Sequence, residues 1–481
     1  MNPDANDLYD LEKENLVAII LELREVISQQ AARIQVLEDQ LAKNSQNSGK
    51  PPSSDGLKKM PRRRNLREKG QRKTGGQKGH PGHTLKMVAK PDHVERHPAQ
   101  TCPHCQADLQ QVAATSMERR QVFDVPPVRL EVTEHQAEIK CCPCCGEMVK
   151  GVFPPEVTQP VQYGPRLKAQ AVYLNSYQLL PLGRVSELFA DFYGHAPSDA
   201  LTLTSSETLV EQIIPVLQVI QSQLTAADVI HCDESGLRVA GQLHWLHSTG
   251  TPRLTYYAVH RKRGQVALRD IGILPAFAGR VVHDAWVSYF QFEHCTHALC
   301  NAHHLRELQF IVDRYQQSWA QDLFTLLLDI KQEVEAAPPQ AHALPAARLA
   351  HYSQRYDALV QQGLAANPPP ALALSSTRGR KKQTPPKNLL DRLLKYKSET
   401  LAFMYDFRVP FDNNLAERDV RMIKVKQKVS GAFRTSLGAA IFCALRSYIS
   451  TVRKQGGSVI QALYDALLGH PFIPVVSVLP E

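Results

Sequence analysis

The chain has 481 residues, 43% of them hydrophobic, so it is long enough for several domains with apolar cores. Its formal charge of +9 at pH 7 points to a polyanionic partner such as nucleic acid. No uncharged apolar run reaches about 18 residues, and the first residues are acidic, so we expect neither a membrane span nor a secretory signal.

The first predicted element is a helix over residues 8–43 with a heptad repeat. One heptad position holds Ile20, Ile27, Ile34 and Leu41, and the position four residues earlier holds Leu16, Leu23, Gln30 and Leu37. β-Branched residues at the first position and Leu at the second favour a parallel two-stranded coiled coil, and hence a homodimer. The alternative is a single amphipathic helix packed on its own body. The polar linker that follows favours the coiled coil.

Residues 44–90 form that linker, and its polar start cannot pack a core. From Lys58 to Lys78 it holds ten Lys or Arg and one acid, Glu68. Such a run is either a solvated tail or an arm that follows DNA phosphates, and the other features of the chain favour the arm. The residues assigned to DNA contact there are Arg62, Arg63, Arg64, Arg67, Arg72 and Lys73.

Two Cys-x-x-Cys motifs follow, Cys102-Pro-His-Cys105 and Cys142-Pro-Cys-Cys145, with strands predicted at 120–126 and 130–139 between them. This spacing is typical of a structural zinc ribbon with four thiolates, and it favours a reducing cytoplasm over free core cysteines or disulfides. Cys141 and Cys144 form an overlapping motif. We assign Cys142 and Cys145 because Pro follows the first thiol and Gly the second, as is common in zinc knuckles.

Residues 163–177, 182–193 and 202–224 are predicted helices, separated by Pro- and Gly-containing turns. They form either a helix-turn-helix that binds DNA or a helical connector packed on the core. The sequence does not decide between these two interpretations.

From Ala227 the apolar pattern changes to short runs. Strands are predicted at 229–232, 243–248, 254–259 and 280–283, with a candidate fifth at 297–299 and a helix at 265–271. Three antiparallel strands, a helix and a further strand are the order of an RNase H-like core. Asp233 then follows the central first strand, and Asp284 follows its parallel neighbour.

Beyond Leu305 the chain is predicted to be helical to Glu333 and again over 388–405, as an insertion that interrupts the core. A basic helix follows. Near its start, one helix face carries Glu417, Arg421, Lys424 and Lys428. The three cations are assigned to DNA contact, and the carboxylate is the third candidate acid.

Asp233, Asp284 and Glu417 are the candidate catalytic residues. A carboxylate at the end of a buried strand is costly unless it is paired or bound to metal. Magnesium prefers oxygen ligands, and two such ions roughly 4 Å apart can activate water and stabilise a leaving oxygen on phosphorus. Helix capping for Asp284 and pairing with Arg421 for Glu417 are ordinary alternatives, but the three acids together favour a magnesium or manganese site. Glu234 points to the other face of its strand and is assigned a structural role.

A second cluster of possible ligands comprises His294, Cys295, His297, Cys300, His303 and His304. Zinc held by Cys295, Cys300 and His303 is one interpretation. Packing or hydrogen bonding is favoured, because these residues share one short stretch without a second knuckle.

In this order, the motifs closely resemble bacterial insertion-sequence transposases of the IS66 family. The resemblance covers nearly the whole chain and includes the zinc knuckles, Asn47-Ser-Gly-Lys-Pro-Pro-Ser-Ser-Asp55, Gly75-Gly-Gln-Lys-Gly-His80, His283-Asp-Ala-Trp, Leu299-Cys-Asn-Ala-His-His-Leu-Arg-Glu-Leu308 and Asn413-Asn-Leu-Ala-Glu-Arg418. It implies a DDE triad on Asp233, Asp284 and Glu417, with cleavage at element ends and strand transfer into target DNA. It also implies accessory proteins of the same element. Cys300 and His303 match a Cys-x-x-His signature that follows the second acid in several transposase families.

The sequence therefore predicts an α/β multidomain protein whose RNase H-like core, a mixed sheet with flanking helices, is interrupted by a helical insertion. The predicted segments are a coiled coil (1–45), a basic arm (46–98), a zinc ribbon (99–158), a helical DNA-binding region (159–227), the core (228–310 and 400–455), the insertion (311–399) and a tail (456–481). The expected function is a magnesium-dependent transposase with structural zinc, acting on double-stranded DNA in the bacterial cytoplasm. Its rivals are a DNA-binding regulator and a structure-specific nuclease without strand transfer.

Overall fold

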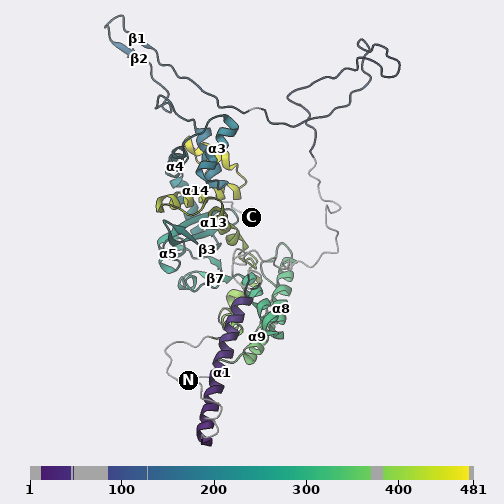
Figure 1. Cartoon of the computed structure of the whole chain (residues 1–481), viewed down its shortest axis with the longest axis vertical. Helices are drawn as coiled ribbons and strands as arrows, with labels where there is room; N and C mark the ends of the chain where they lie inside the picture. Colours follow the sequence, from purple (N-terminus) through teal and green to yellow (C-terminus); the bar gives the residue numbers. More distant parts are fainter. Residues whose placement is uncertain (1–11, 45–46, 48–84, 127, 370–382, 476–481) are drawn as a thin grey trace.

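The structure is a computed structural model that describes residues 12–44, 47, 85–126, 128–369 and 383–475. Figure 1 shows an α/β body, a long N-terminal helix beside the part that contains α8 and α9, and the cysteine-rich segment at the other end. No helix within the described ranges combines the length and apolarity needed to cross a bilayer.

A five-stranded mixed sheet lies at the centre of the body. Its strands are β3 (Val229–Val239), β4 (Gln242–Gly250), β5 (Thr255–His260), β6 (Arg280–His283) and β7 (Thr296–Leu299). The spatial order is β5-β4-β3-β6-β7, with β3 antiparallel to β4 and parallel to β6. The antiparallel trio, its parallel neighbour and the candidate fifth strand are confirmed.

Strand β3 is longer than the apolar run that predicted it. The run ends at Cys232, but pairing with β4 continues from Asp233 opposite Ser248 to the end of the strand at Val239. Asp233 therefore lies within a strand rather than after one, because the backbone ladder supplies hydrogen bonds whatever the side chain. Asp284 directly follows the last residue of β6, as predicted.

The two faces of the sheet carry different partners. Ile230 and Cys232 of β3 belong to a core shared with α4 (Asp199–Thr225) and α14 (Ser436–Lys454). Leu237 and Val239 belong to another core, which contains Ile423 of α13 (Asn414–Ser430) and also Phe442 of α14. Since side chains alternate along a strand, Asp233 shares the α13 face and Glu234 lies on the opposite face.

The helices before the sheet join the first of these cores. The segment predicted as one helix at 163–177 is α2 (Pro165–Val172) followed by a single π-helical turn, η2 (Tyr173–Tyr177). Next come α3 (Leu182–Tyr193) and α4, and α2 and α4 both pack on α15 (Val459–Leu467) near the C-terminus. Such packing on the sheet's own core is what the connector interpretation requires.

Short helices connect the strands, and longer ones follow the sheet. Between β5 and β7 lie α5 (Gln265–Ile271), α6 (Ile273–Ala276) and the 3-10 turn η3 (Tyr289–Gln291). After β7 come α7 (Asn301–Tyr315), α8 (Ser318–Glu335), α9 (Ala346–Ala366), α10 (Pro385–Lys395), α11 (Lys397–Thr400) and α12 (Ala402–Tyr405). The helices after β7 form a further core, which includes Val282 of β6. Because Val282 pairs with His231, that core lies on the Asp233 face of the sheet.

Helix α1 (Lys13–Ala42) buries its C-terminal end on the body but leaves its heptad stripe exposed. Asp39, the buried residue of the helix, accepts hydrogen bonds from the Tyr315 hydroxyl at 2.5 Å and from Arg314 Nε at 3.3 Å. In contrast, Ile27 and Leu41 of the stripe are 64% and 87% exposed. The end of α1 thus contacts the body through Asp39, while the body leaves the heptad stripe uncovered.

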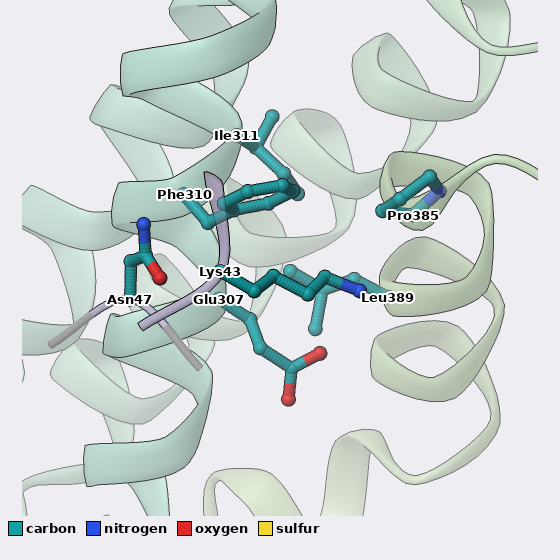
Figure 2. Close-up of a pocket in the computed structure, with 7 residues that line it drawn as sticks. All are labelled: Lys43, Asn47, Glu307, Phe310, Ile311, Pro385 and Leu389. Carbon is teal, nitrogen blue, oxygen red and sulfur yellow. The ribbon is translucent and has the colours of Figure 1, made fainter. Parts of the chain in front are cut away.

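A small pocket marks the junction between α1 and the insertion. Figure 2 shows the Lys43 side chain lying between Phe310 of α7 and Leu389 of α10. The Lys43 ammonium lies 5.5 Å from the centre of the Phe310 ring, a cation–π contact. None of the candidate catalytic acids lines this pocket, so we regard it as a packing junction.

Candidate active site

Three acids from different elements converge on the α13 face of the sheet. Asp233 comes from the middle of β3, Asp284 from the end of β6 and Glu417 from the first turn of α13. Burial, followed by the negative charges of Glu234, Asp284 and Glu417, raises the pKa of Asp233 well above its ordinary value. The acids are therefore close enough to repel one another when ionised.

The strand acids have few protein partners. One oxygen of Asp233 accepts the Glu234 amide at 2.8 Å, and one oxygen of Asp284 accepts the Trp286 amide at 3.1 Å. Burial, then the charge of Glu234, also raises the pKa of Asp284. Neither aspartate forms an ion pair with a Lys or Arg in the described part of the chain. Crowded, buried carboxylates without a cation are costly when ionised.

Glu417 faces the start of α7. Its Oε1 is buried and has no hydrogen-bond partner among the described residues; Arg306 lies 3.6 Å away and His303 Nδ1 3.9 Å away. His303 Nδ1 also lacks a hydrogen bond there, and burial, then Arg306, lowers the pKa of this histidine. Donor atoms of Cys300, His303 and Glu417 all lie within 4.8 Å of one another.

The three acids offer the oxygen donors that a small divalent cation prefers, although among the described residues the donor group within 4.8 Å of one another is Cys300, His303 and Glu417, without Asp233 or Asp284. Carboxylate oxygens that repel one another and have few protein partners gain most from a hard cation with oxygen ligands. Asp233, Asp284 and Glu417 are the residues that would hold it. The thiol and imidazole of Cys300 and His303 are softer donors beside them.

The raised pKa of Asp233 leads to a prediction about stability. Its folded-state pKa exceeds that of the unfolded chain, so native stability falls as pH rises from the ordinary value through the raised one. Asp233→Asn removes this penalty. Without added divalent metal we expect it to raise the melting temperature at pH 8 by about 2–4 °C, the effect of roughly 1 kcal/mol in a domain of about 200 residues.

Calorimetry at pH 8 and pH 5 checks this prediction. The gain should shrink at pH 5, because the penalty of the raised pKa accumulates only as pH rises above the ordinary value of an aspartate. Added magnesium should raise the melting temperature of the unaltered chain more than that of Asp233→Asn. An equal gain at both pH values would contradict the prediction.

Glu234 is engaged on the opposite face of the sheet. Its Oε1 accepts hydrogen bonds from Arg263, with Nε and Nη2 each at 2.8 Å, and its Oε2 accepts the Tyr289 hydroxyl at 2.7 Å. The side chain is 2% exposed. The Arg263 guanidinium lies over the rings of Trp245 and Trp286, at 4.8 and 3.8 Å from their centres. Both carboxylate oxygens of Glu234 are thus committed to protein partners.

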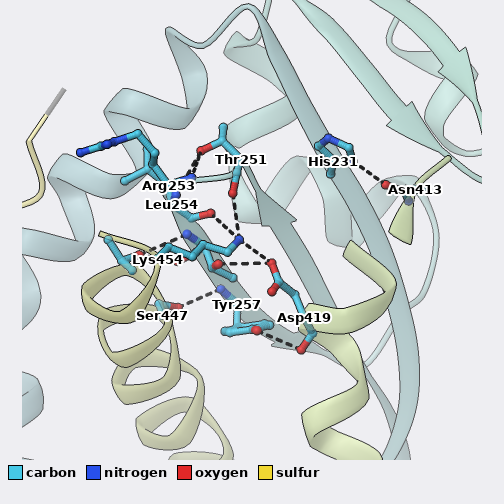
Figure 3. Close-up of polar contacts among 11 residues, drawn as sticks. His231, Thr251, Arg253, Leu254, Tyr257, Asn413, Asp419, Ser447 and Lys454 are labelled. Carbon is cyan, nitrogen blue, oxygen red and sulfur yellow. Dashed lines mark hydrogen bonds and ion pairs between the residues drawn. The ribbon is translucent and has the colours of Figure 1, made fainter. Parts of the chain in front are cut away.

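Sequence reasoning missed two polar residues beside the acids, His231 and Asn413. The Asn413 side chain forms a hydrogen bond with His231 Nδ1 at 2.9 Å (Figure 3). It also donates to the Cys232 carbonyl at 2.8 Å. Both residues are buried, at 6% and 2% exposure. The available signal was an Asn immediately before a helix, which indicates only a helix cap.

A second anchor fixes α13 just beyond Glu417. Asp419 forms an ion pair with Lys454 of α14 at 2.7 Å and accepts a hydrogen bond from Thr255 Oγ1 at 3.2 Å. Its carbonyl accepts the Tyr257 hydroxyl at 2.9 Å (Figure 3). The first turn of α13 is therefore attached to the sheet on both sides of Glu417.

The structure does not assemble the alternative zinc site that the sequence offered. Cys295 donates its thiol to the Phe292 carbonyl and is absent from the cluster of Cys300, His303 and Glu417, so the zinc set Cys295, Cys300 and His303 is not assembled. On α13, Arg421 and Lys428 are exposed.

One residue assigned to DNA contact is also engaged within the protein. Lys424 is partly buried and donates to the Gly236 carbonyl at 2.8 Å, because its helix packs directly on β3. It therefore helps to fix α13 to the sheet. The arm residues Arg62, Arg63, Arg64, Arg67, Arg72 and Lys73 lie outside the described residues.

The cysteine motifs form two matching turns. The Cys102 amide donates to the Ala107 carbonyl at 2.9 Å, and the Cys142 amide donates to the Glu147 carbonyl at 2.8 Å. Backbone hydrogen bonds to each first thiol, the largest from Cys105 and Cys145 respectively, lower the pKa of Cys102 and Cys142 and so favour the thiolate that binds zinc. In the described residues the two turns are not gathered within ligand distance of each other.

The strands predicted within this segment are wrong. Residues 120–126 and 130–138 have no strand, and the described part of the segment contains only the hairpin of β1 (Ile139–Cys141) and β2 (Met148–Lys150). An alternating pattern indicates a strand, but a strand needs a neighbour to pair with. Val122 and Val132, 92% and 89% exposed, have no such neighbour.

Three family models match the chain. Residues 160–441, more than half of it, match the family described as Transposase IS66 family. Residues 99–146 match the zinc-finger binding domain of transposase IS66, and residues 1–86 match a family of unknown function (DUF6444). No curated protein matches the chain. The first match contains all three candidate acids, and the second contains both cysteine turns.

Proposed function

The chain belongs to the Transposase IS66 family, and from this premise we propose that it is a magnesium-dependent DDE transposase. Membership makes it a DNA-processing enzyme of transposition, and its zinc-finger domain carries structural zinc. The observation that carries the proposal is the convergence of Asp233, Asp284 and Glu417 on one face of the sheet.

An RNase H-like core is part of this proposal. The order β5-β4-β3-β6-β7, with an antiparallel trio and a parallel neighbour, supports it. The helices between β7 and α13 then form the insertion that separates the second and third acids.

Each residue has a role that follows from its place. Divalent cations held by the three carboxylates would polarise the scissile phosphate and stabilise the departing oxygen. Asp233 and Asp284 are held by the rigid ladder of β3 and β6, and Glu417 by the anchored turn of α13. Arg421 lies 3.6 Å from Glu417 and is 62% exposed, so its guanidinium can contact a DNA phosphate beside the carboxylates.

Strand transfer distinguishes this function from its rivals. The test incubates the full chain and magnesium with labelled DNA carrying the ends of the element that encodes it. A transposase yields nicked ends with free 3′ hydroxyls and then joined products. Nicks without joined products would favour a nuclease. Binding without any nick would favour a regulator.

The exposed stripe of α1 supports a homodimer as a further part of the proposal. Isoleucine and leucine side chains along one face of an exposed helix are stabilised when a second copy of that helix covers them. Its members Ile20, Leu23, Ile27, Ile34, Leu37 and Leu41 are all more than half exposed. Pairing through this stripe would let the protein hold two element ends, because tethering raises the local concentration of the second site.

Replacing Ile27 and Ile34 together with Lys is expected to separate the dimer. Lysine charges between the two helices would lose hydration without gaining a partner. Light scattering should therefore report a monomer at tens of micromolar. Nicking of single ends should survive better than joining of paired ends. The matched control places Lys at Ser28 and Ala32, which lie off the stripe on the same helix. The zipper would be refuted if the double variant kept the molar mass of the unaltered chain in solution, or if the unaltered chain were already monomeric.

A further inference from the structure

Asn413 forms a hydrogen bond through each of its four polar atoms. Its amide N–H donates to Cys300 Sγ at 3.1 Å, and its carbonyl accepts the Glu417 amide at 3.1 Å. Its side-chain nitrogen donates to the Cys232 carbonyl at 2.8 Å, and its side-chain oxygen faces His231 Nδ1 at 2.9 Å. Since that oxygen can only accept, the His231 Nδ1 carries the proton.

The Asn413 side chain does not cap the helix that it precedes. Asn413 is the N-cap of α13, where an Asn side chain ordinarily accepts a hydrogen bond from the first helical turn. Here it makes no such bond and reaches across to β3 instead. The neighbouring Asp412 carboxylate accepts the Asn414 amide at 3.0 Å, which supplies one bond near the helix start. The side chain of Asn413 is thus committed to joining two elements.

The contacts of Asn413 connect the segments that carry all three acids. His231 and Cys232 directly precede Asp233 on β3, and Asn413 reaches them at the end of the ladder between β3 and β6. The Glu417 amide is bonded to Asn413 itself. The third segment is joined through Cys300, whose amide donates to the carbonyl of His283, the residue before Asp284, at 3.0 Å.

We propose that Asn413 is a positioning residue for the metal site: it sets the spacing of Glu417 from Asp233 so that both carboxylates can bind one cation. This inference rests on the proposed function, because it takes the acids as metal ligands. Asn413 itself touches neither metal nor DNA in this role. Residues that hold ligands in place typically contribute about 10- to 100-fold to metal affinity.

Manganese binding by the full-length, zinc-loaded chain tests the proposal without any DNA. The electron paramagnetic resonance signal of free Mn²⁺ is followed through a titration, and the titration of Asp233→Asn gives the background from other sites. Asn413→Ala is expected to weaken the binding above that background by at least about tenfold. Ser458→Ala, which removes the hydrogen bond to Gln461 that caps α15 away from the acids, is the matched control and should bind as the unaltered chain does.

A second variant separates positioning from charge and from misfolding. Asn413→Asp keeps the shape and the oxygen that faces His231, but it loses the donor to Cys232. The added negative charge would by itself strengthen cation binding. Weaker binding in a chain whose melting temperature matches that of Ser458→Ala therefore supports positioning.

The outcomes distinguish this proposal from the proposed function. If Asp233→Asn and Glu417→Gln lose manganese while both Asn413 variants bind like the unaltered chain, the role of Asn413 is overturned and the metal site stands. If Asp233→Asn and Glu417→Gln bind manganese as the unaltered chain does, the metal site itself is wrong.

Discussion

Asp233→Asn, Asp284→Asn and Glu417→Gln should each lower the rate of cleavage at element ends by at least about 10²-fold, the scale of removing one strong electrostatic stabiliser. Each change removes a charge but keeps the side-chain shape, so the fold should survive. DNA binding should be nearly unchanged, because the three substitutions alter no residue of the basic arm and none of the exposed cations of α13. Gel assays of end cleavage and of end binding on the same preparations give both numbers.

Glu234→Gln is the matched control for these three substitutions. Glu234 neighbours Asp233 in sequence, but Arg263 and Tyr289 engage its oxygens on the opposite face. Loss of the Glu234 charge should lower the melting temperature, since an amide pairs poorly with the guanidinium. The cleavage rate should fall far less than in the three variants above. If Glu234→Gln abolished cleavage while Asp233→Asn did not, the assignment of the two faces would be wrong.

Cys102→Ser or Cys105→Ser should release the zinc and unfold residues 99–155. The hairpin of β1 and β2 is short, and the segment exposes large apolar side chains such as Val122. It therefore has little core of its own, and metal binding must supply its folding free energy, on the order of 10 kcal/mol in small zinc domains. Elemental analysis of the unaltered protein should find about one zinc per chain.

Cys141→Ser and Cys144→Ser are the controls, and each should keep the zinc. The turn that matches Cys102–Cys105 is built on Cys142 and Cys145, because the Gly146 amide donates to the Cys142 carbonyl as the Gln106 amide does to Cys102, both at 2.9 Å. Zinc loss from the Cys141 or Cys144 variant alone would shift the ligand assignment. Folded protein without zinc would refute the ribbon.

Sequence patterns predicted the sheet well because each strand contains a short apolar run. Ile230, Val281 and Val282 mark two parallel neighbours, and the carboxylates beside them already indicated a site. Glu417 could be identified near the start of its helix because it shares one predicted helix face with the basic residues that follow it. The alternation of side chains along a strand was enough to place Asp233 and Glu234 on opposite faces of β3.

Features that depend on distant contacts were not predictable. The extension of β3 past Cys232 depends on pairing with β4, and the role of Asn413 depends on residues more than a hundred positions away. Lys424 looked like a DNA contact because its helix face is basic, but tertiary packing directs its ammonium to Gly236. In each case a long-range hydrogen bond, and not the local pattern, decided the outcome.

The central claim is that Asp233, Asp284 and Glu417 hold divalent metal. The most direct measurement is the anomalous diffraction of manganese soaked into crystals of the full chain, with the zinc signal separated by wavelength. The account predicts manganese bound by carboxylate oxygens of all three acids at about 2.1 Å, as expected of a small octahedral cation. Manganese bound only by Cys300, His303 and Glu417, without Asp233 and Asp284, would contradict it.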